Sequence, residues 1–265
     1  MLTNMFSTTT HLINHDNIFS KIVFTIFIII IFYVLLQVGL FIIDKMIVPN
    51  DDPILINELV ASPHPKRIHN NPNIANSKPI MRSVNKPSGI EFSWSVWVFL
   101  EIPSASPELP AYIFFKGEKN EPVIKATGIN GVNGPGVYID KNYENLMVYM
   151  DLYNDDREII TVHGIPIRKW VNIIIRCNQS VLDVFINGTL AQSRELTDIP
   201  KQNYDDTYAA KFNGQLSLLQ YYSYAIDLLT IQDIIKKGPN LKSKETNIYK
   251  ESKPQYLSLQ WFFNS

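Results

Sequence analysis

The most apolar run of the chain lies near its N-terminus. Residues 22–43 contain no charged side chain, and a helix needs about 20 apolar residues to cross the hydrocarbon layer of a membrane. Lys21 precedes the run and Asp44 and Lys45 follow it, which would keep charges in water at both interfaces. The pattern predicts one transmembrane helix over residues 21–45.

A cleaved signal peptide would have a shorter apolar stretch followed by small residues. This run is long and bulky, so an uncleaved anchor is the favoured interpretation. A buried core helix is disfavoured because the run is apolar on every face. We expect a single-pass membrane protein with the lipid bilayer as partner through residues 22–43. Lys21 and Lys45 lie on opposite sides of the run, so the charges that the positive-inside rule compares are nearly equal. The orientation of the helix in the membrane therefore stays open.

Further along, hydrophobic residues alternate with period two over residues 90–100, which predicts a strand. Its inner face would carry Phe92, Trp94, Val96, Val98 and Leu100. Further short strands are predicted over residues 112–115, 137–139, 146–152, 159–162, 170–177, 181–186 and 216–222. Many short strands separated by turns indicate an antiparallel sandwich. Its core is expected to bury Trp94, Trp97 and Trp170.

Two local signals refine this pattern. Asn187-Gly188 separates two apolar segments and predicts a type I′ hairpin, because both central positions need a positive φ. Residues 227–237 have helical spacing, with lysines at the end and Gly238-Pro239 as a stop. One short helix is therefore expected to close the domain.

Residues 46–87 are rich in proline and asparagine, which interrupts any periodicity. The segment is interpreted as a stalk or as an extended segment lying along the domain. Within it, residues 80–84 could pack as an edge strand.

Composition narrows the classes of function. The chain has 265 residues and a net charge of -1, so we expect one main domain and no nucleic-acid partner. The only cysteine, Cys177, cannot form an intramolecular disulfide, and its apolar surroundings predict a buried thiol rather than a nucleophile.

Several segments together resemble the laminin-G-like, concanavalin A-like jelly roll. The resemblance covers residues 89–239. It rests on residues 92–98 as the opening strand, 113–117, 170–174, the hairpin at 182–188, and 214–219 leading to 224–227 and the helix. It implies an all-β, antiparallel jelly-roll sandwich.

An N-terminal anchor, the run 82–85 before 89–92, and the run 236–239 resemble proteins of this class from large nucleocytoplasmic DNA viruses. This second resemblance implies a virion membrane or capsid-associated component, with other capsid or membrane proteins as partners.

The sequence offers few candidates for catalytic or metal-binding residues. A retaining glycosidase needs two carboxylates about 5 Å apart, and Asp151 has tyrosines, not acids, two positions away on either side. No catalytic residue and no cofactor are expected. Asp151, Asn154, Asp155 and Asp156 provide hard oxygen ligands for calcium, but the same sequence is also ordinary turn chemistry, which is favoured. The histidines lack zinc-ligand spacing.

Two further features stay open. Asn178 and Asn187 begin N-glycosylation tripeptides, which matter only in a secretory lumen. The apolar C-terminal run, residues 256–263, either docks on the domain as a strand or contacts a partner or membrane; docking is favoured.

We therefore expect a non-enzymatic, membrane-anchored interaction or structural protein. The alternative is a membrane-anchored lectin that binds glycans, and a degenerate hydrolase ranks third. The expected organisation is a tail (1–20), the transmembrane helix (21–45), a stalk (46–87), the jelly-roll domain (88–240) and a C-terminal tail (241–265).

Overall fold

The computed structural model describes most of the chain. The described residues are 18–47, 50–62, 64–104, 111–117, 124–125, 128–129, 131–154 and 156–243. The chain divides into two compact units, Met1–Pro49 and Asn50–Ser265, each of which is described by itself.

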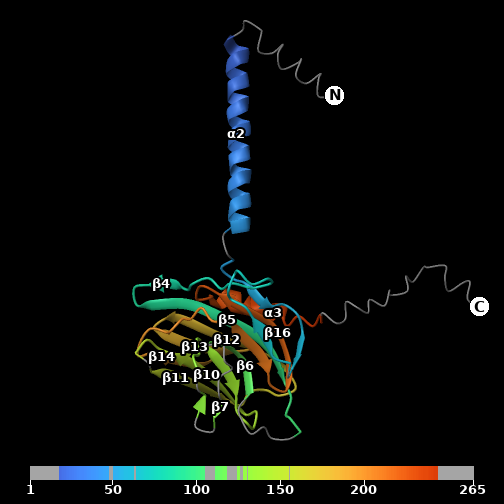
Figure 1. Cartoon of the computed structure of the whole chain (residues 1–265), viewed down its shortest axis with the longest axis vertical. Helices are drawn as coiled ribbons and strands as arrows, with labels where there is room; N and C mark the ends of the chain where they lie inside the picture. Colours follow the sequence, from blue (N-terminus) through green and yellow to red (C-terminus); the bar gives the residue numbers. More distant parts are fainter. Residues whose placement is uncertain are drawn as a thin grey trace, which may run out of the picture. The chain divides into compact units, whose positions relative to one another are not determined.

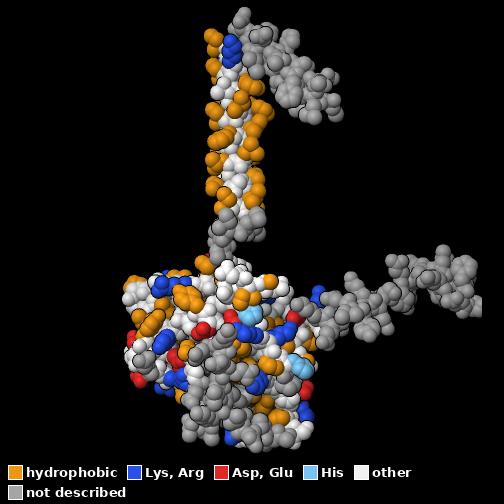
Figure 2. All heavy atoms as spheres, in the orientation of Figure 1, with side chains coloured by type: hydrophobic (Ala, Val, Ile, Leu, Met, Phe, Trp, Pro, Cys, Tyr) orange, Lys and Arg blue, Asp and Glu red, His pale blue; other side chains and the backbone are white. Residues whose placement is uncertain are grey.

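The first unit contains the helix α2, Ile18–Ile47, which extends a few residues beyond the expected span at each end. The most apolar 18-residue window within its stretch Ile18–Ile43 has a mean hydropathy of 3.0, and none of that window is buried. Figure 2 shows apolar side chains along its length. In the described part of the chain this is the one helix whose length and composition suit a membrane span, although an N-terminal signal sequence has the same properties.

The second unit consists mainly of two antiparallel sheets (Figure 1). The strands of the first sheet follow the order β1 (Ile54–Ile56), β16 (Gly214–Tyr222), β5 (Gly89–Leu100), β12 (Trp170–Gln179), β13 (Val181–Ile186) and β14 (Thr189–Glu195). In addition, β2 (Val60–Ser62) pairs with β16, and β4 (Val84–Lys86) pairs with β5.

The second sheet has six strands. Their order is β11 (Arg157–His163), β10 (Asn145–Asp151), β9 (Gly136–Ile139), β6 (Ala111–Lys116), β15 (Thr207–Lys211) and β3 (Lys66–Ile68). A separate short ribbon pairs β7 (Ile124–Lys125) with β8 (Gly128–Ile129). The expected antiparallel β-sandwich is therefore confirmed, whereas its assignment to the laminin-G-like jelly rolls stays a prediction.

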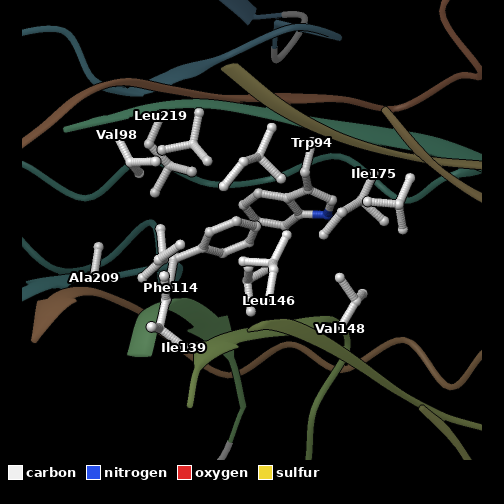
Figure 3. Close-up of a cluster of buried hydrophobic side chains, with 14 of the residues drawn as sticks. Trp94, Val98, Phe114, Ile139, Leu146, Val148, Ile175, Ala209 and Leu219 are labelled. Carbon is white, nitrogen blue, oxygen red and sulfur yellow. The ribbon is translucent and has the colours of Figure 1, made fainter. Parts of the chain in front are cut away.

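The core lies between the sheets. The alternating face of β5 is buried as predicted, and all five of its expected core residues belong to the main hydrophobic cluster. Trp94 stacks on Phe114 of the opposite sheet, with ring centroids 5.1 Å apart (Figure 3). Trp97 is buried on the other face of β5, and Trp170 is only partly buried. Contact between aromatic rings fixes the spacing of the two sheets near Trp94.

The predicted hairpin is confirmed. Asn187 and Gly188 have φ values of 50° and 79°, and they join β13 to β14 with Ile186 opposite Thr189. The positive φ at both positions is what a type I′ turn requires.

The closing helix is also confirmed as α3, Leu228–Lys237. The side chain of Asp227 accepts a hydrogen bond from the backbone N–H of Thr230, and Gly238 ends the helix with φ 71°. Ile231 of α3 packs with Ile174 and Phe185 on the outer face of the first sheet. This helix therefore covers apolar side chains that the sandwich core does not hold.

Short parts of the proline-rich segment, residues 46–87, belong to the two sheets of the sandwich. They supply β1, β2, β3 and β4, each only three residues long. The edge strand expected over residues 80–84 is not found there: residues 80–83 form no strand, and β4 begins at Val84 and pairs with β5. Strands this short show no measurable period, so sequence pattern did not reveal them.

The C-terminal prediction lies mostly outside the described residues, which end at residue 243. At that end, Lys242 accepts a hydrogen bond at its carbonyl from the N–H of Leu59, at 2.9 Å. The boundaries expected for the globular domain, residues 88 and 240, stay a prediction.

Candidate functional site

One groove in the second unit has the size of a ligand site. Its volume is about 800 Å³, within the range of pockets that hold small molecules. Its two walls are residues 80–90 and residues 199–204, and Tyr153 adds to it from the turn after β10. The floor comes from Phe92, Trp94 and Tyr221, with Lys116 and Gly134 at the end.

The floor of the groove is rigid. Trp94 meets Tyr221 edge to face, with centroids 5.0 Å apart, and both rings are almost fully buried. Burial raises the pKa of the Tyr221 phenol, so this group is neutral at physiological pH. The floor is therefore a mainly apolar base of aromatic side chains from β5 and β16.

The first wall is held by hydrogen bonds and by a close backbone approach. The Ser83 hydroxyl donates to Gln202 Oε1 at 2.9 Å, which ties this wall to the second. Gly89 has φ 152°, and a Cβ there would lie 2.6 Å from the carbonyl oxygen of Gln179. Only glycine fits at that position, so the path of the wall into β5 is fixed by the sequence.

The second wall is fixed in a similar way. Asn203 Nδ2 donates to the carbonyl of Lys116 at 3.1 Å, which ties the wall to the end of β6. A Cβ on Gly134 would lie 2.8 Å from the carbonyl oxygen of Lys201. The loop 199–204 therefore lies directly against the backbone before β9.

Exposed aromatic rings and amides give the groove its chemical character. Tyr153 is 60% exposed and Tyr204 is 82% exposed, although both line the groove. The amides of Asn85, Gln202 and Asn203 lie on the walls between them. Exposed rings flanked by a few polar groups are typical of sites that hold a small polar ligand by its faces and its hydroxyl groups.

Charge in the groove is of one sign. Its described lining contains three cationic side chains, Arg82, Lys86 and Lys116, and no carboxylate. Lys116 is only 5% exposed, and its ammonium donates to the carbonyl of Asp205 at 2.5 Å. Burial lowers the pKa of Lys116 to about 8, and the carboxylates of Asp205 and Asp206 oppose this shift.

The acidic residues singled out from the sequence lie elsewhere and are occupied by protein groups. Asp151 accepts hydrogen bonds from Arg157 Nε at 2.5 Å and from the Asn133 N–H at 2.8 Å, so each carboxylate oxygen has a protein donor. Asp156 accepts from the Asn154 side chain at 3.0 Å in an exposed turn. Asp155 lies outside the described residues.

These residues do not assemble a metal centre in the described chain. No group of three or more acidic, histidine or cysteine side chains that could hold a metal ion occurs there. Asp151 and Asp156 line a smaller hollow of about 190 Å³ together with Arg157 and Lys201. No aromatic residue lines that hollow, and the guanidinium of Arg157 already pairs with Asp151.

The remaining candidates are placed as follows. Asn187 is exposed in its turn, and its side-chain oxygen accepts from the Asn172 N–H at 2.9 Å. Asn178 is exposed but lies in β12 and not in a turn. Cys177 is fully buried, and burial raises its pKa to about 12, which supports an inert core thiol.

Sequence reasoning did not find the groove. Its residues come from a proline-rich segment, one turn and one loop that are far apart in the chain, and none forms a recognisable spacing. The exposed tyrosines and the amides line one site only when the fold brings these loops together. The one signal for the groove in the sequence is the run 82–85, which forms part of the resemblance to the viral proteins.

Comparison with known proteins adds the following. No family model and no curated protein matches the chain. Among solved structures, the receptor binding domain of botulinum neurotoxin D matches 71% of this chain and 52% of its own, at 13% identity and a TM-score of 0.48. The botulinum neurotoxin serotype G binding domain matches 70% and 46%, at 12% identity and 0.47.

A third structure is the botulinum neurotoxin serotype D ligand binding domain in complex with N-acetylneuraminic acid. It matches 58% of this chain and 39% of its own, at 17% identity and a TM-score of 0.43. The chain thus spans about half of these proteins or less. At such scores the likeness bears on neither the ligand nor the partner of this chain.

Proposed function

We propose that this chain is a single-pass membrane protein whose β-sandwich binds a saccharide in the groove without catalysing a reaction. The observation that carries the proposal is the groove itself, about 800 Å³ in volume, with the exposed rings of Tyr153 and Tyr204 and three amides on its walls. A sugar presents an apolar face to a ring and hydroxyl groups to amides, so these groups are complementary to it.

The lining also argues against a glycosidase in this groove. Such an enzyme places two carboxylates on either side of the bond that is broken, and the described lining contains none. Binding without turnover is therefore the role that its chemistry favours.

The anchor would act by keeping the binding domain near a membrane. Residues 48–53 are all that separates α2 from β1, and six extended residues reach about 20 Å. A tether this short would raise the effective concentration of the domain for ligands on the same surface. A virion membrane or capsid setting, with other coat or membrane proteins as partners, rests on the sequence resemblance alone.

A glycan array tests the proposal. The full-length protein, incorporated into nanodiscs of neutral lipid, should bind a subset of the printed glycans. Tyr204→Ala should raise the Kd for a bound glycan about threefold to tenfold, because one aromatic contact contributes about 0.5–1.5 kcal/mol. Tyr224→Ala is the control, since Tyr224 is exposed outside the groove.

Two results would contradict the proposal: no binding to any glycan, or equal losses from both tyrosine variants. The anchor is tested separately by alkaline carbonate extraction of membranes. The protein should stay in the pellet, and its release into the supernatant would exclude the span.

A further inference from the structure

We propose that the groove contains an anion subsite, in which Arg82 and Lys116 hold a carboxylate or sulfate group of the bound saccharide. This assignment rests on the proposed saccharide-binding function and names the class of sugar that the groove selects.

Arg82 is the first part of the subsite. Its side chain is exposed on the first wall of the groove and has no hydrogen bond or ion pair within the described chain. The planar guanidinium has five donors in a fork that matches the two oxygens of a carboxylate or a sulfate. An unpaired arginine at the rim of a groove is thus ready to make charge-assisted hydrogen bonds to such a group.

Lys116 is the second part. In β6, Phe114 faces the main core and Phe115 the outer aromatic cluster, so alternation turns Lys116 back toward the interior between the sheets. Its ammonium has three donors, and one of them is used by the Asp205 carbonyl. Burying an ammonium without a carboxylate in contact is costly, and an anion in the groove would offset that cost.

The carboxylates of Asp205 and Asp206 both raise the pKa of Lys116, but neither forms an ion pair with it in the described chain. Asp206 is engaged by Arg67 Nε at 2.6 Å, by the His69 ring at 3.0 Å and by the Asn70 N–H at 3.0 Å. The described ion pairs include Arg67 and His69 with Asp206 but none with Lys116. Lys116, which lines the groove, therefore has no direct counter-ion in the described chain.

Lys86 is left out of the subsite because it already has a partner. Its ammonium lies 3.8 Å from the Glu91 carboxylate. It adds positive potential near the opening of the groove, which would favour the approach of an anionic ligand. The absence of any carboxylate from the described lining means that nothing there would repel such a ligand.

The test uses the full-length protein in neutral nanodiscs and an array on which each neutral glycan is printed beside its sialylated and its sulfated form. The acidic forms should bind about tenfold more tightly than their neutral parents, the effect expected of one charge-assisted pair. The sialylated and sulfated arms show which anion is preferred, and added salt should weaken the preference.

Arg82→Gln should reduce binding of the acidic forms to the level of the neutral ones, while Arg82→Lys should retain part of the preference. The matched control is Arg194→Gln, since Arg194 is exposed on β14 outside the groove and has no hydrogen bond or ion pair in the described chain. Lys116→Met should also remove the preference, and its fold is checked by circular dichroism.

The outcomes separate the two proposals. Equal binding of neutral and acidic forms, or a preference that survives Arg82→Gln, would overturn the subsite and leave saccharide binding intact. A blank array would overturn the proposed function and the subsite with it. Binding of the protein to vesicles containing phosphatidylserine, with no binding to acidic glycans, would assign Arg82 to a lipid headgroup and refute the saccharide subsite.

Discussion

The sandwich contains two polar regions that differ in how completely their groups are paired. In the Asp151 cluster (Asp151, Asn133, Tyr138 and Arg157), the carboxylate receives donors on both oxygens, and the Tyr138 hydroxyl donates to Asn133 Oδ1 at 2.6 Å. In the groove, by contrast, Arg82 has no partner in the described chain and Lys116 has one. The cluster is built for stability, while the groove keeps donors available for a ligand.

The difference also separates the groove from Asp151, one of the acids that the sequence offers as a calcium ligand. Asp151 pins the segment before β9 to β10, since its side chain accepts from the Asn133 N–H and its backbone N–H donates to the Asn133 carbonyl at 3.0 Å. Each oxygen of this carboxylate thus accepts a hydrogen bond from another part of the chain. A single substitution in either region tests this difference in hydrogen-bond pairing.

The largest expected effect is on the Asp151 cluster. Asp151→Ala should lower the free energy of unfolding by about 3 kcal/mol, because it leaves the partly buried Arg157 and the Asn133 N–H without their partner. Urea unfolding followed by tryptophan fluorescence measures the loss. Calcium should leave the melting temperature of the wild type unchanged; a calcium-dependent rise would show that the acidic turn is a metal site.

The next effect concerns Lys116. Its folded pKa of about 8 lies below the ordinary value of 10.5, so between these values the unfolded chain binds more protons. Stability should therefore rise with pH above 8, by at most about 1.4 kcal/mol per pH unit. The measurement is the difference between wild type and Lys116→Met from pH 7 to 9.5, below the range where tyrosines titrate.

A flat difference over that range would mean that Lys116 keeps an ordinary pKa and is not a desolvated cation. A rise is diagnostic of burial, because a lysine stabilised by an ion pair would lose stability only above pH 10.5, outside this range.

A smaller effect is expected at the hairpin. Gly188→Val should cost about 1–2 kcal/mol, since a β-branched residue is strained at positive φ. A Cβ there would also lie 3.2 Å from Ile235 Cγ1 of α3. Gly164→Val is the matched control, because Gly164 has φ 73° with no atom within 4 Å of its Cβ position. Equal losses would show that contact with α3 contributes nothing.

The smallest effect should come from Arg82. Arg82→Gln should change the free energy of unfolding by less than about 0.5 kcal/mol, as expected for an exposed side chain without a partner. Urea unfolding beside wild type measures it. A loss of 2 kcal/mol would show that Arg82 supports the fold and would remove it from the ligand site.

Much of the fold could be predicted because its signals are local. The period of β5, the Asn187-Gly188 turn and the helix stop at Gly238 each act within a few residues and appear where expected. The short strands β1 to β4 and the strand β15 were missed, because three to five residues in a proline-rich or mixed context have no detectable period. The pairing of β1, β2 and β3 depends on partners more than a hundred residues away.

The groove could not be predicted from the sequence for the same physical reason. Its function depends on which polar groups the fold leaves unpaired, and pairing is a property of contacts across the chain. The Ser83 hydroxyl donates a hydrogen bond to Gln202, whereas the nearby Arg82 forms no hydrogen bond or ion pair with any described residue. No spacing in the sequence distinguishes these neighbours.

Hydrogen exchange with mass spectrometry tests the central claim most directly. The full-length protein in neutral nanodiscs is compared with and without a saturating concentration of the glycan that binds best on the array. Peptides covering residues 80–90 and 199–204 should exchange more slowly with the glycan bound, and those covering residues 151–157 should be unchanged. Protection of residues 151–157, with none at the two walls of the groove, would contradict the account.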